Sequence, residues 1–411
     1  MRVLMLSWEY PPNVKGGMGT HVAGLAPALV RAGVEVHVIT PQPSGLPGSA
    51  NASVDIHDPG GELTEDGVRV YRVPLASSGS DVYQQAQTTN QALQDCGYAL
   101  LANGQSFDLI HAHDWLVVFC AQALKHQFRL PLLATVHATE RGRARGAPLC
   151  TDLQIRIHGA EWWLVYEGWR IIACSHHMAS EVQAFFNAPS EKIDIVPNGV
   201  NPYHHDRWTQ PELADCRARY GGQDRQIVFA VGRLVHEKGF HLLIDAVPHV
   251  LAEFPNTQFV IAGQGVEASY LTHQARGLGV ADYVSLPGFI SDEERDCLYH
   301  VAACAAFPSL YEPFGVVALE AMAAGCPVVV ADTGGLREVV CHGKTGLTVY
   351  PNDVQSLVWG VLHTLRNPAM AAARAEEGKQ IVGREFSWDT IAARTIAVYQ
   401  RVVHDRRKID W

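Results

Sequence analysis

Residues 307–320, FPSLYEPFGVVALE, join the end of an apolar strand, a loop with two prolines and the start of a helix. An apolar run that stops at Pro308 is typical of a buried strand, and Gly315 followed by a second apolar run indicates a helix start. The same alternation of short apolar runs with helical patterns recurs along the whole chain. Strands that alternate with helices of this length predict βαβ units and a parallel sheet.

The alternation forms two series, which predicts an α/β protein with two doubly wound, Rossmann-like parallel-sheet domains and a cleft between them. Expected strands cover 3–6, 34–40, 68–73, 109–112, 130–136, 171–174 and 193–196, then 227–231, 259–262, 284–286, 305–308 and 327–331. Expected helices cover 20–31, 81–102 and 155–166, then 240–253, 268–277, 292–302, 315–324, 354–365 and 387–403. Residues 41–66 read as a long loop and 197–222 as the linker, so we expect domains over 1–200 and 201–386, followed by a C-terminal helix over 387–411. Ligands of such sheets bind beyond the carboxyl ends of the strands.

Composition narrows the class of protein. The 411 residues suggest two or three domains, and 47% apolar with 18% charged residues is typical of a globular chain. With 32 Lys and Arg against 42 Asp and Glu, the net charge is −10 and neither half of the chain is basic. This charge argues against a nucleic-acid partner held by phosphate contacts.

The cysteines and the N-terminal residues indicate the cellular compartment of the protein. Nine cysteines without a C-x-x-C pair argue against a disulfide framework or a cysteine zinc site. The first apolar run stops at Glu9, and no cleavage site follows it, so we expect no signal peptide. The sequence contains no run of about 18 apolar residues, so we expect no membrane span. A cytoplasmic protein is expected.

Two carboxylates stand in the quoted stretch, one in the loop and one in the helix. The first-turn N–H groups of Gly315, Val316 and Val317 have no partner within a helix, so they predict an anion site. Glu312 precedes this turn and Glu320 follows it. Carboxylates grip sugar hydroxyls well because an ionised acceptor makes stronger hydrogen bonds. Glu320 could instead lie on a solvated face, but its neighbours are apolar, and a buried carboxylate needs a partner.

Two cations follow the strand expected at 227–231. Arg233 and Lys238 lie in GRLVHEKG (232–239), at the carboxyl end of that strand. One interpretation is a surface loop in which a cation pairs with Glu237. The functional interpretation is a clamp on a diphosphate leaving group, because cations there stabilise developing negative charge.

Glycine-rich turns follow two strands. Gly16 and Gly17 precede the first helix and can expose backbone N–H groups to an anion, although a plain tight turn is the alternative. Gly263, Gly265 and Ala268 match G-x-G-x-x-A, which suggests an NAD-binding oxidoreductase. The acidic residue expected at the end of the next strand is missing, so this interpretation is disfavoured.

Histidines end two strands of the first series. His111, His113 and Asp114 in HAHDW could begin a metal site, but a third ligand is not evident. We expect polar groups that line the cleft instead, together with His137 in TVHATE. The chain has no D-x-D pair of the kind that metal-dependent glycosyl transferases use, which favours a metal-free mechanism and no cofactor.

As a set, these motifs resemble the retaining glycosyltransferases of family 4, which have the two-domain GT-B fold, and especially glycogen-synthase-like members. The resemblance covers nearly the whole chain. Its pieces are WEYPPNVKGGMG (8–19), HAHDW (111–115), TVHATE (135–140), VPNGV (196–200), GRLVHEKG (232–239), AGQG (262–265), PGF (287–289), Glu312 to Glu320, and GGLREVV (334–340). Single motifs are weak signals, but their order and spacing together are specific.

The resemblance implies roles for residues that match the family's motifs. Arg233 and Lys238 would neutralise the donor diphosphate, Glu312 would lie beside the transferred sugar, and Glu320 would hold the ribose hydroxyls. Further donor contacts would come from Gly16, Gly17, Gly263, Ile290, Phe314, Gly315, Val316 and Val317. His137 would contact the sugar near its C6, and Asp114 would lie near the acceptor. The last helix would cross back onto the first domain.

The resemblance also implies a reaction. The leaving phosphate would assist deprotonation of the acceptor on the same face of the sugar, so no glycosidase-like carboxylate pair is needed. Closeness to glycogen synthases favours an ADP-glucose or UDP-glucose donor and an α-1,4-glucan acceptor. A sugar-phosphate or lipid acceptor, with a membrane contact through Arg141, Arg143 and Arg145, stays an alternative, as do a nucleotide-sugar epimerase and an inactive sugar-nucleotide-binding protein.

Overall fold

The computed structural model divides into two compact units. Unit 1 comprises Met1–Gly199 and Trp388–Trp411, and unit 2 comprises Val200–Ser387. The structure describes residues 1–14, 16–42, 61–76, 79, 81–201, 208–222, 225–409 and 411. Most of the loop expected at 41–66 and part of the expected linker therefore lie outside the described residues. Among the described helices, none has the length and apolar character needed to cross a membrane.

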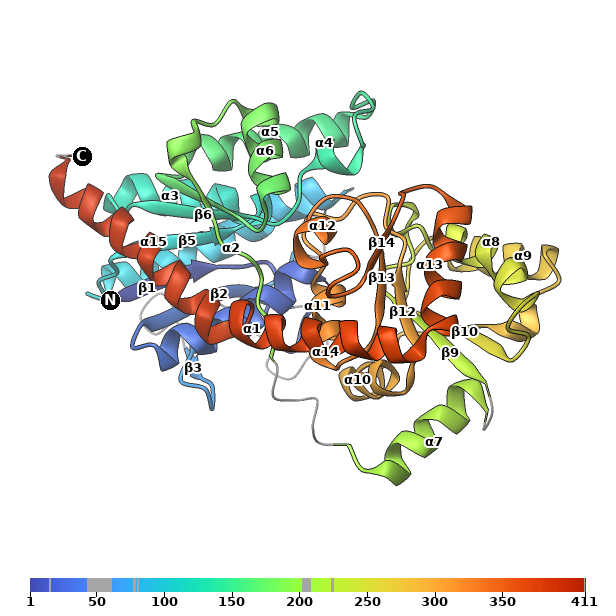
Figure 1. The fold of residues 1–411 in the computed structure, drawn as a ribbon. Coiled ribbons are helices and arrows are strands. Elements are labelled where there is room, and N and C mark those ends of the chain that lie inside the picture. The colour runs from blue at the N-terminus through green and yellow to red at the C-terminus, as the bar shows by residue number, and fades with distance from the viewer. Residues whose placement is uncertain are drawn as a thin grey trace. The chain divides into compact units, whose positions relative to one another are not determined.

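Unit 1 is built on an eight-stranded sheet in the order β3-β4-β2-β1-β5-β6-β7-β8 (Figure 1). The strands are β1 Arg2–Leu6, β2 Glu35–Gln42, β3 Glu62–Leu63, β4 Arg69–Pro74, β5 Leu109–His113, β6 Leu132–Val136, β7 Arg170–Ala173 and β8 Ile193–Ile195. All pairings are parallel except β3 with β4. The strand order reverses between β1 and β5, where a parallel sheet opens a crevice at its carboxyl edge.

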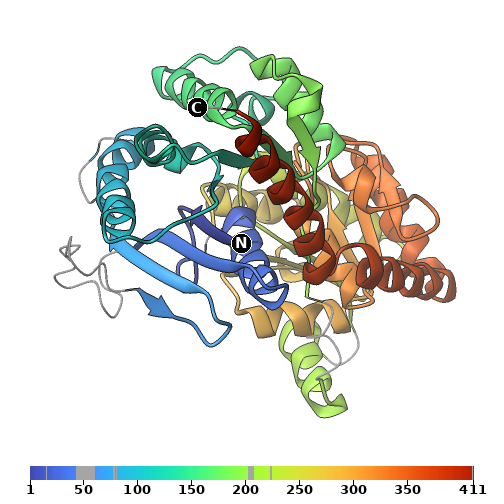
Figure 2. The same cartoon turned by 90° about the vertical axis from the view of Figure 1, so that its left-hand side faces the viewer.

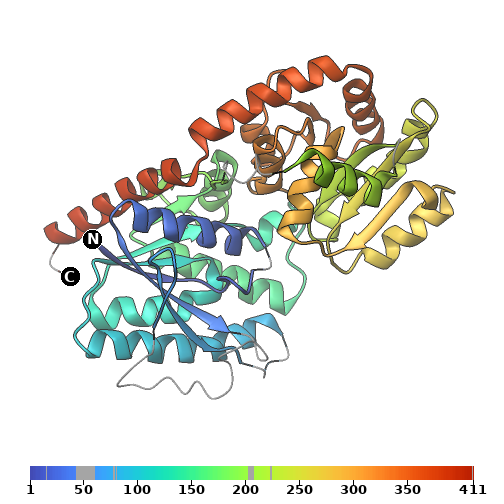
Figure 3. The same cartoon turned by 90° about the horizontal axis from the view of Figure 1, so that it is seen from below.

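Helices cover both faces of this sheet. They are α1 Gly17–Arg31, α2 Val82–Ala102, α3 Val118–Phe128, α4 Glu140–Arg143, α5 Asp152–Glu167, α6 His176–Phe186 and α15 Trp388–Lys408. Helices α2, α3 and α5 pack on one another, while α1 and α15 share a core with β1 and β2. In Figures 2 and 3, α15 runs beside α1.

The C-terminal helix is tied to unit 1 by its first residue. A Cβ at Gly24 of α1 would lie 2.0 Å from the ring of Trp388, so only glycine lets this indole reach α1. Further along α15, Ile391, Val398 and Tyr399 are buried in the same core. Burial of each such side chain contributes about 1.5–3 kcal/mol, so α15 is an integral part of unit 1.

Unit 2 has a six-stranded sheet in the order β11-β10-β9-β12-β13-β14, and its pairings are all parallel. The strands are β9 Gln226–Val231, β10 Thr257–Ala262, β11 Val284–Gly288, β12 Cys304–Phe307, β13 Val328–Ala331 and β14 Leu347–Val349. Strand order reverses between β9 and β12, so the loops after these two strands meet at the switch point of the sheet.

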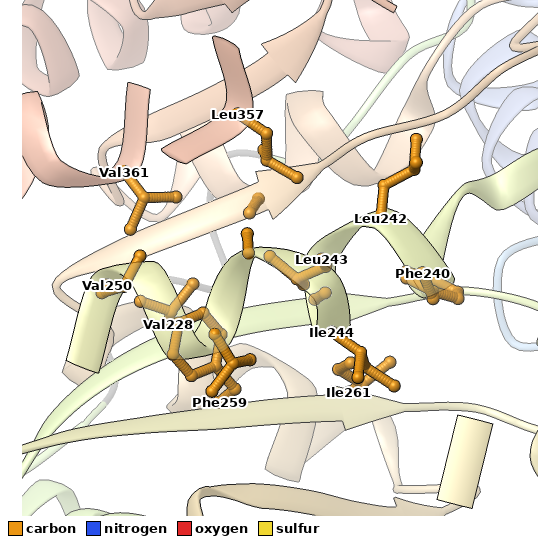
Figure 4. Packing of buried hydrophobic residues seen from close by; sticks show 14 of the residues in the cluster. Val228, Phe240, Leu242, Leu243, Ile244, Val250, Phe259, Ile261, Leu357 and Val361 are labelled. Carbon is orange, nitrogen blue, oxygen red and sulfur yellow. The ribbon is translucent and has the colours of Figure 1, made fainter. Parts of the chain in front are cut away.

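The helices of unit 2 lie in two layers. They are α7 Gln210–Gly221, α8 Phe240–Leu251, α9 Ala268–Gly277, α10 Asp292–Val301, α11 Val316–Ala323, α12 Leu336–Val339, α13 Val354–Arg366 and α14 Pro368–Glu385. Figure 4 shows the core on one face, where Leu243 and Val250 of α8 lie between the strands and α13. Helices α7, α10, α11 and α14 pack among themselves.

The predicted α/β class with two Rossmann-like parallel-sheet domains is confirmed, and every expected strand and helix is present. The expected linker was partly wrong, because α7 occupies its second half and packs on α10. Helices α3, α4, α6, α12 and α14 and strands β3 and β14 were not predicted. α14 buries mainly small residues such as Ala371 and Ala375, so its sequence carries only a weak apolar stripe.

Candidate functional site

The switch point of unit 2 brings two sequence motifs together. Lys238 ends a short 3₁₀ turn after β9, and Glu312 lies in the loop after β12. Lys238 Nζ lies 2.6 Å from Glu312 Oε2, and Ser309 donates to the same oxygen at 3.3 Å. The backbone N–H of Leu310 also donates to Glu237 O at 2.8 Å, which joins the two loops. A buried carboxylate paired with a lysine therefore lies at the carboxyl edge of this sheet.

The helix start beside this pair is built as expected for an anion site. Gly315 is the N-cap of α11 with a left-handed φ of 108°, a conformation that favours glycine. The first-turn N–H groups of α11 point out of the helix, with the positive end of its dipole behind them. Gly335 donates to Glu312 O at 2.9 Å and holds the loop from behind. Phe314 is buried, with its ring 6.2 Å from that of Phe386.

Arg233 stands apart from this pair. Its side chain is 55% exposed, and its guanidinium lies 3.5 Å from Glu237 Oε1. The pairing with Glu237 is the one that the surface-loop interpretation anticipated. The exposed guanidinium can also reach an anion in solution, which a weak ion pair of this kind does not prevent.

Glu320 is buried on α11 and has protein partners. Arg295 Nε lies 3.4 Å from Glu320 Oε2, and the Tyr299 hydroxyl lies 3.5 Å from the same oxygen and 3.2 Å from Val317 O. Burial and the charge of Glu320 raise the pKa of Tyr299. Sequence reasoning missed Arg295 and Tyr299, although their i, i+4 spacing places them on one face of α10.

The G-x-G-x-x-A stretch has a packing role in this fold. Gly263 donates to Gly288 O at 2.7 Å, and a Cβ on Gly263 would lie 1.8 Å from Gly232 O. Leu234 also donates to Gln264 O at 2.8 Å. The glycines thus let the loops after β9, β10 and β11 approach one another, which accounts for the pattern without a dinucleotide. Ile290 is buried beyond β11.

Unit 1 presents its own residues at the carboxyl edge of its sheet. Gly16 caps α1 and donates to Glu9 Oε2 at 3.1 Å. A Cβ at Gly16 or Gly17 would meet no described atom within 4 Å, so the turn is open on that side. Asp114 follows β5 with a left-handed φ of 60°, and its carboxylate accepts from His137 N at 2.7 Å. Burial raises the pKa of Asp114 to about 6 and lowers the pKa of His137 to about 3.

His111 and His113 are fully buried, which corrects the expectation that they line a cleft. His111 contacts the Tyr399 hydroxyl at 2.8 Å and Thr135 Oγ1 at 2.7 Å, so both of its ring nitrogens are satisfied within the core. His113 Nδ1 lies 3.2 Å from His137 Nε2. His21 of α1, which the sequence did not single out, lies with His113 and His137, and one ring nitrogen of each lies within 4.8 Å of the other two.

A further buried carboxylate supports the loop that carries His137. Glu161 of α5 accepts from Glu140 N at 2.8 Å, at the start of α4. Burial raises the pKa of Glu161 to about 7. Arg143 lies 3.4 Å from Glu140, and the Arg141 guanidinium lies 5.3 Å from the centre of the Phe185 ring, so these two cations of the basic loop have partners within unit 1.

Comparisons with known proteins identify the family of the chain. Residues 15–204 match the family model described as Glycosyltransferase Family 4, and residues 217–381 match the one described as Glycosyl transferases group 1. A glycogen synthase of Mycobacterium tuberculosis is 39% identical over 97% of this chain and 94% of its own length. An uncharacterized glycosyltransferase of Methanocaldococcus jannaschii is 37% identical over 97% of this chain and 98% of its own length.

Among solved structures, sucrose-phosphate synthase of Thermosynechococcus elongatus has a TM-score of 0.79 at 24% identity. The match covers 98% of this chain and 99% of that chain, which supports the fold. The resemblance stated from the motifs is confirmed. The chain belongs to glycosyltransferase family 4 and is a glycosyltransferase with the GT-B fold.

Proposed function

We propose that this protein is a retaining, metal-independent glucosyltransferase that transfers glucose from a nucleoside-diphosphate glucose to the non-reducing end of an α-1,4-glucan. The observation that carries the proposal is the Lys238–Glu312 pair at the switch point of unit 2, beside the start of α11. Identity of 39% with a glycogen synthase over nearly the whole chain supports the glucan acceptor.

The diphosphate of the donor binds at the start of α11 in this proposal. The first-turn N–H groups and Lys238 stabilise the charge that gathers on the leaving diphosphate, and Arg233 adds its exposed guanidinium. Glu312 lies next to Lys238. In this proposal its carboxylate also lies beside the transferred sugar, where positive charge develops at the anomeric carbon. Glu320 holds the ribose hydroxyls, and Gly263 and Ile290 form part of the loops around the nucleoside.

Bond changes in the transfer balance without a protein base. The bond from the anomeric carbon to the diphosphate oxygen breaks, and a bond from that carbon to the acceptor hydroxyl oxygen forms on the same face. The acceptor proton passes to the leaving diphosphate. His137 contacts the transferred sugar as a neutral imidazole, because burial lowers its pKa to about 3. Asp114 contacts the acceptor.

Release of nucleoside diphosphate tests the proposal. The protein is incubated with ADP-glucose or UDP-glucose, with and without glycogen, and the diphosphate and the glycosidic product are measured. Release that requires glycogen, with glucose added in α-1,4 linkage, supports the proposal. Release that requires a sugar phosphate or a lipid instead would reassign the acceptor. Conversion of the donor to its epimer without any acceptor would refute transfer.

A further inference from the structure

Three histidines from separate segments of unit 1 meet in its interior. His21 lies on α1, His113 ends β5, and His137 follows β6. One ring nitrogen from each lies within 4.8 Å of the corresponding nitrogens of the other two. His21 and His113 are buried, whereas His137 is only partly buried. The cluster therefore lies largely enclosed within unit 1, with His137 the most exposed of its three side chains.

Two of these imidazoles have a ring nitrogen that the fold leaves without a partner. His21 Nδ1 donates to Asn198 Oδ1 at 2.8 Å, so its lone pair is on Nε2. Within the part of the chain that the structure describes, His21 Nε2 and His113 Nε2 are buried and make no hydrogen bond. Unsatisfied buried polar atoms cost about 1–3 kcal/mol each, and the free lone pair of His21 Nε2 calls for a ligand.

The spacing suits a metal ion. His113 Nδ1 and His137 Nε2 are 3.2 Å apart, close to the ~3.3 Å between two ligands of a tetrahedral zinc with bonds of about 2.0–2.1 Å. The Asn198 contact orients His21 in the way that outer partners orient metal-bound histidines.

We infer that His21, His113 and His137 form a site for a divalent transition metal of the zinc class. Three neutral imidazoles are the ligand set that zinc, cobalt and nickel accept, and they leave a fourth position open. The proposed transfer reaction does not use this ion. Since the site uses His137, a bound metal would withdraw this histidine from the donor sugar, and zinc would then inhibit the proposed transfer.

A second set of possible metal ligands must be disabled before Zn²⁺ binding at the three histidines can be measured. His236, His241 and Glu267 of unit 2 also offer ligand atoms within 4.8 Å of one another, and His236 is exposed. His236→Gln is therefore the background for all variants. In this background we measure Zn²⁺ uptake by equilibrium dialysis and the visible spectrum with Co²⁺, in proteins whose folding is checked by circular dichroism.

His236→Gln should bind one Zn²⁺ and give the intense absorption of tetrahedral Co²⁺. Adding His21→Gln should weaken Zn²⁺ binding by about 100-fold or more, and adding Asn198→Ala by about 10–100-fold with all three ligands in place. If His21→Gln fails to fold, Asn198→Ala still tests the site. No Zn²⁺ uptake by folded His236→Gln, or equal uptake after either addition, would overturn the inference. Zn²⁺ binding without inhibition of transfer would leave the metal site standing and would refute the role of His137 in the proposed function.

Discussion

Replacement of Lys238 by methionine separates its structural role from its catalytic one. Lys238 Nζ lies 2.6 Å from Glu312 Oε2, and at an effective dielectric of ~20 two unit charges at this distance attract by roughly 6 kcal/mol. Desolvation of both groups offsets part of this attraction, but loss of one partner leaves the other charge buried alone. We expect Lys238→Met to destabilise the protein by about 3–5 kcal/mol. For a unit of this size, the melting temperature falls by roughly 6–20 °C.

A second substitution removes the negative charge that Lys238→Met leaves buried without a counter-charge. Glu312→Gln keeps the shape of the side chain and its contact with Ser309, but it carries no charge. The double variant should therefore recover most of the lost melting temperature. Differential scanning calorimetry on the wild type, both single variants and the double variant closes the cycle and gives the coupling energy between the two residues.

Turnover should behave differently from stability in the same four proteins. If Lys238 stabilises the leaving diphosphate, kcat at saturating donor falls by ~10²-fold or more in Lys238→Met and stays low in the double variant. Recovery of turnover together with stability would mean that Lys238 serves only as the counter-charge of Glu312. An unchanged melting temperature in Lys238→Met would refute the energetic reasoning about the buried pair.

Four further outcomes test the remaining assignments. Arg233→Ala should leave the melting temperature unchanged, because the side chain is exposed, and should lower kcat by ~10²-fold; full activity would remove Arg233 from the clamp. Glu320→Gln should mainly raise the donor KM, since ribose hydroxyls do not change charge in the reaction, whereas Glu312→Gln should mainly lower kcat; the reverse pattern would exchange the two roles. Dialysis against EDTA should leave transfer intact, and a loss that Mg²⁺ or Mn²⁺ restores would refute a metal-free reaction. Burial raises the pKa of Glu161 from 4.5 to about 7, so the folded state retains the proton of this carboxyl, and the free energy of unfolding falls by up to about 3 kcal/mol as the pH rises from 4.5 to 7. Urea titrations of Glu161→Gln should lack this part of the pH dependence, and a pH profile identical to that of the wild type would contradict the assignment.

Local pattern determined much of the fold. The run from Ala268 to Gly277 has the apolar spacing of a helix, and α9 covers those residues. Strands such as β9 and β13 are almost entirely apolar because parallel strands are buried on both faces. These signals depend on residues close together in the chain, so the sequence alone contains them.

Elements with a weak apolar stripe could not be predicted in this way. Of the residues of α7, only Gly221 is buried, so its sequence resembles a polar linker. Its helical state depends on the capping box at Thr209 and on packing against α10. Strand β14 is three residues long, and it is a strand because β13 pairs with it. Tertiary contact overrides a weak local signal in each case.

The site shows the same division more sharply. Residue type and position after a strand identified Lys238 and Glu312 as candidates, but their contact spans 74 positions of sequence. Only the strand order of unit 2, which places the loops after β9 and β12 together, makes them a pair. Likewise, His113 and His137 were visible at strand ends, whereas His21 reached them only because α1 packs beside β1. Residue types show which side chains could take part in the chemistry. Which of these side chains meet depends on the long-range packing of strands and helices, which no local pattern encodes.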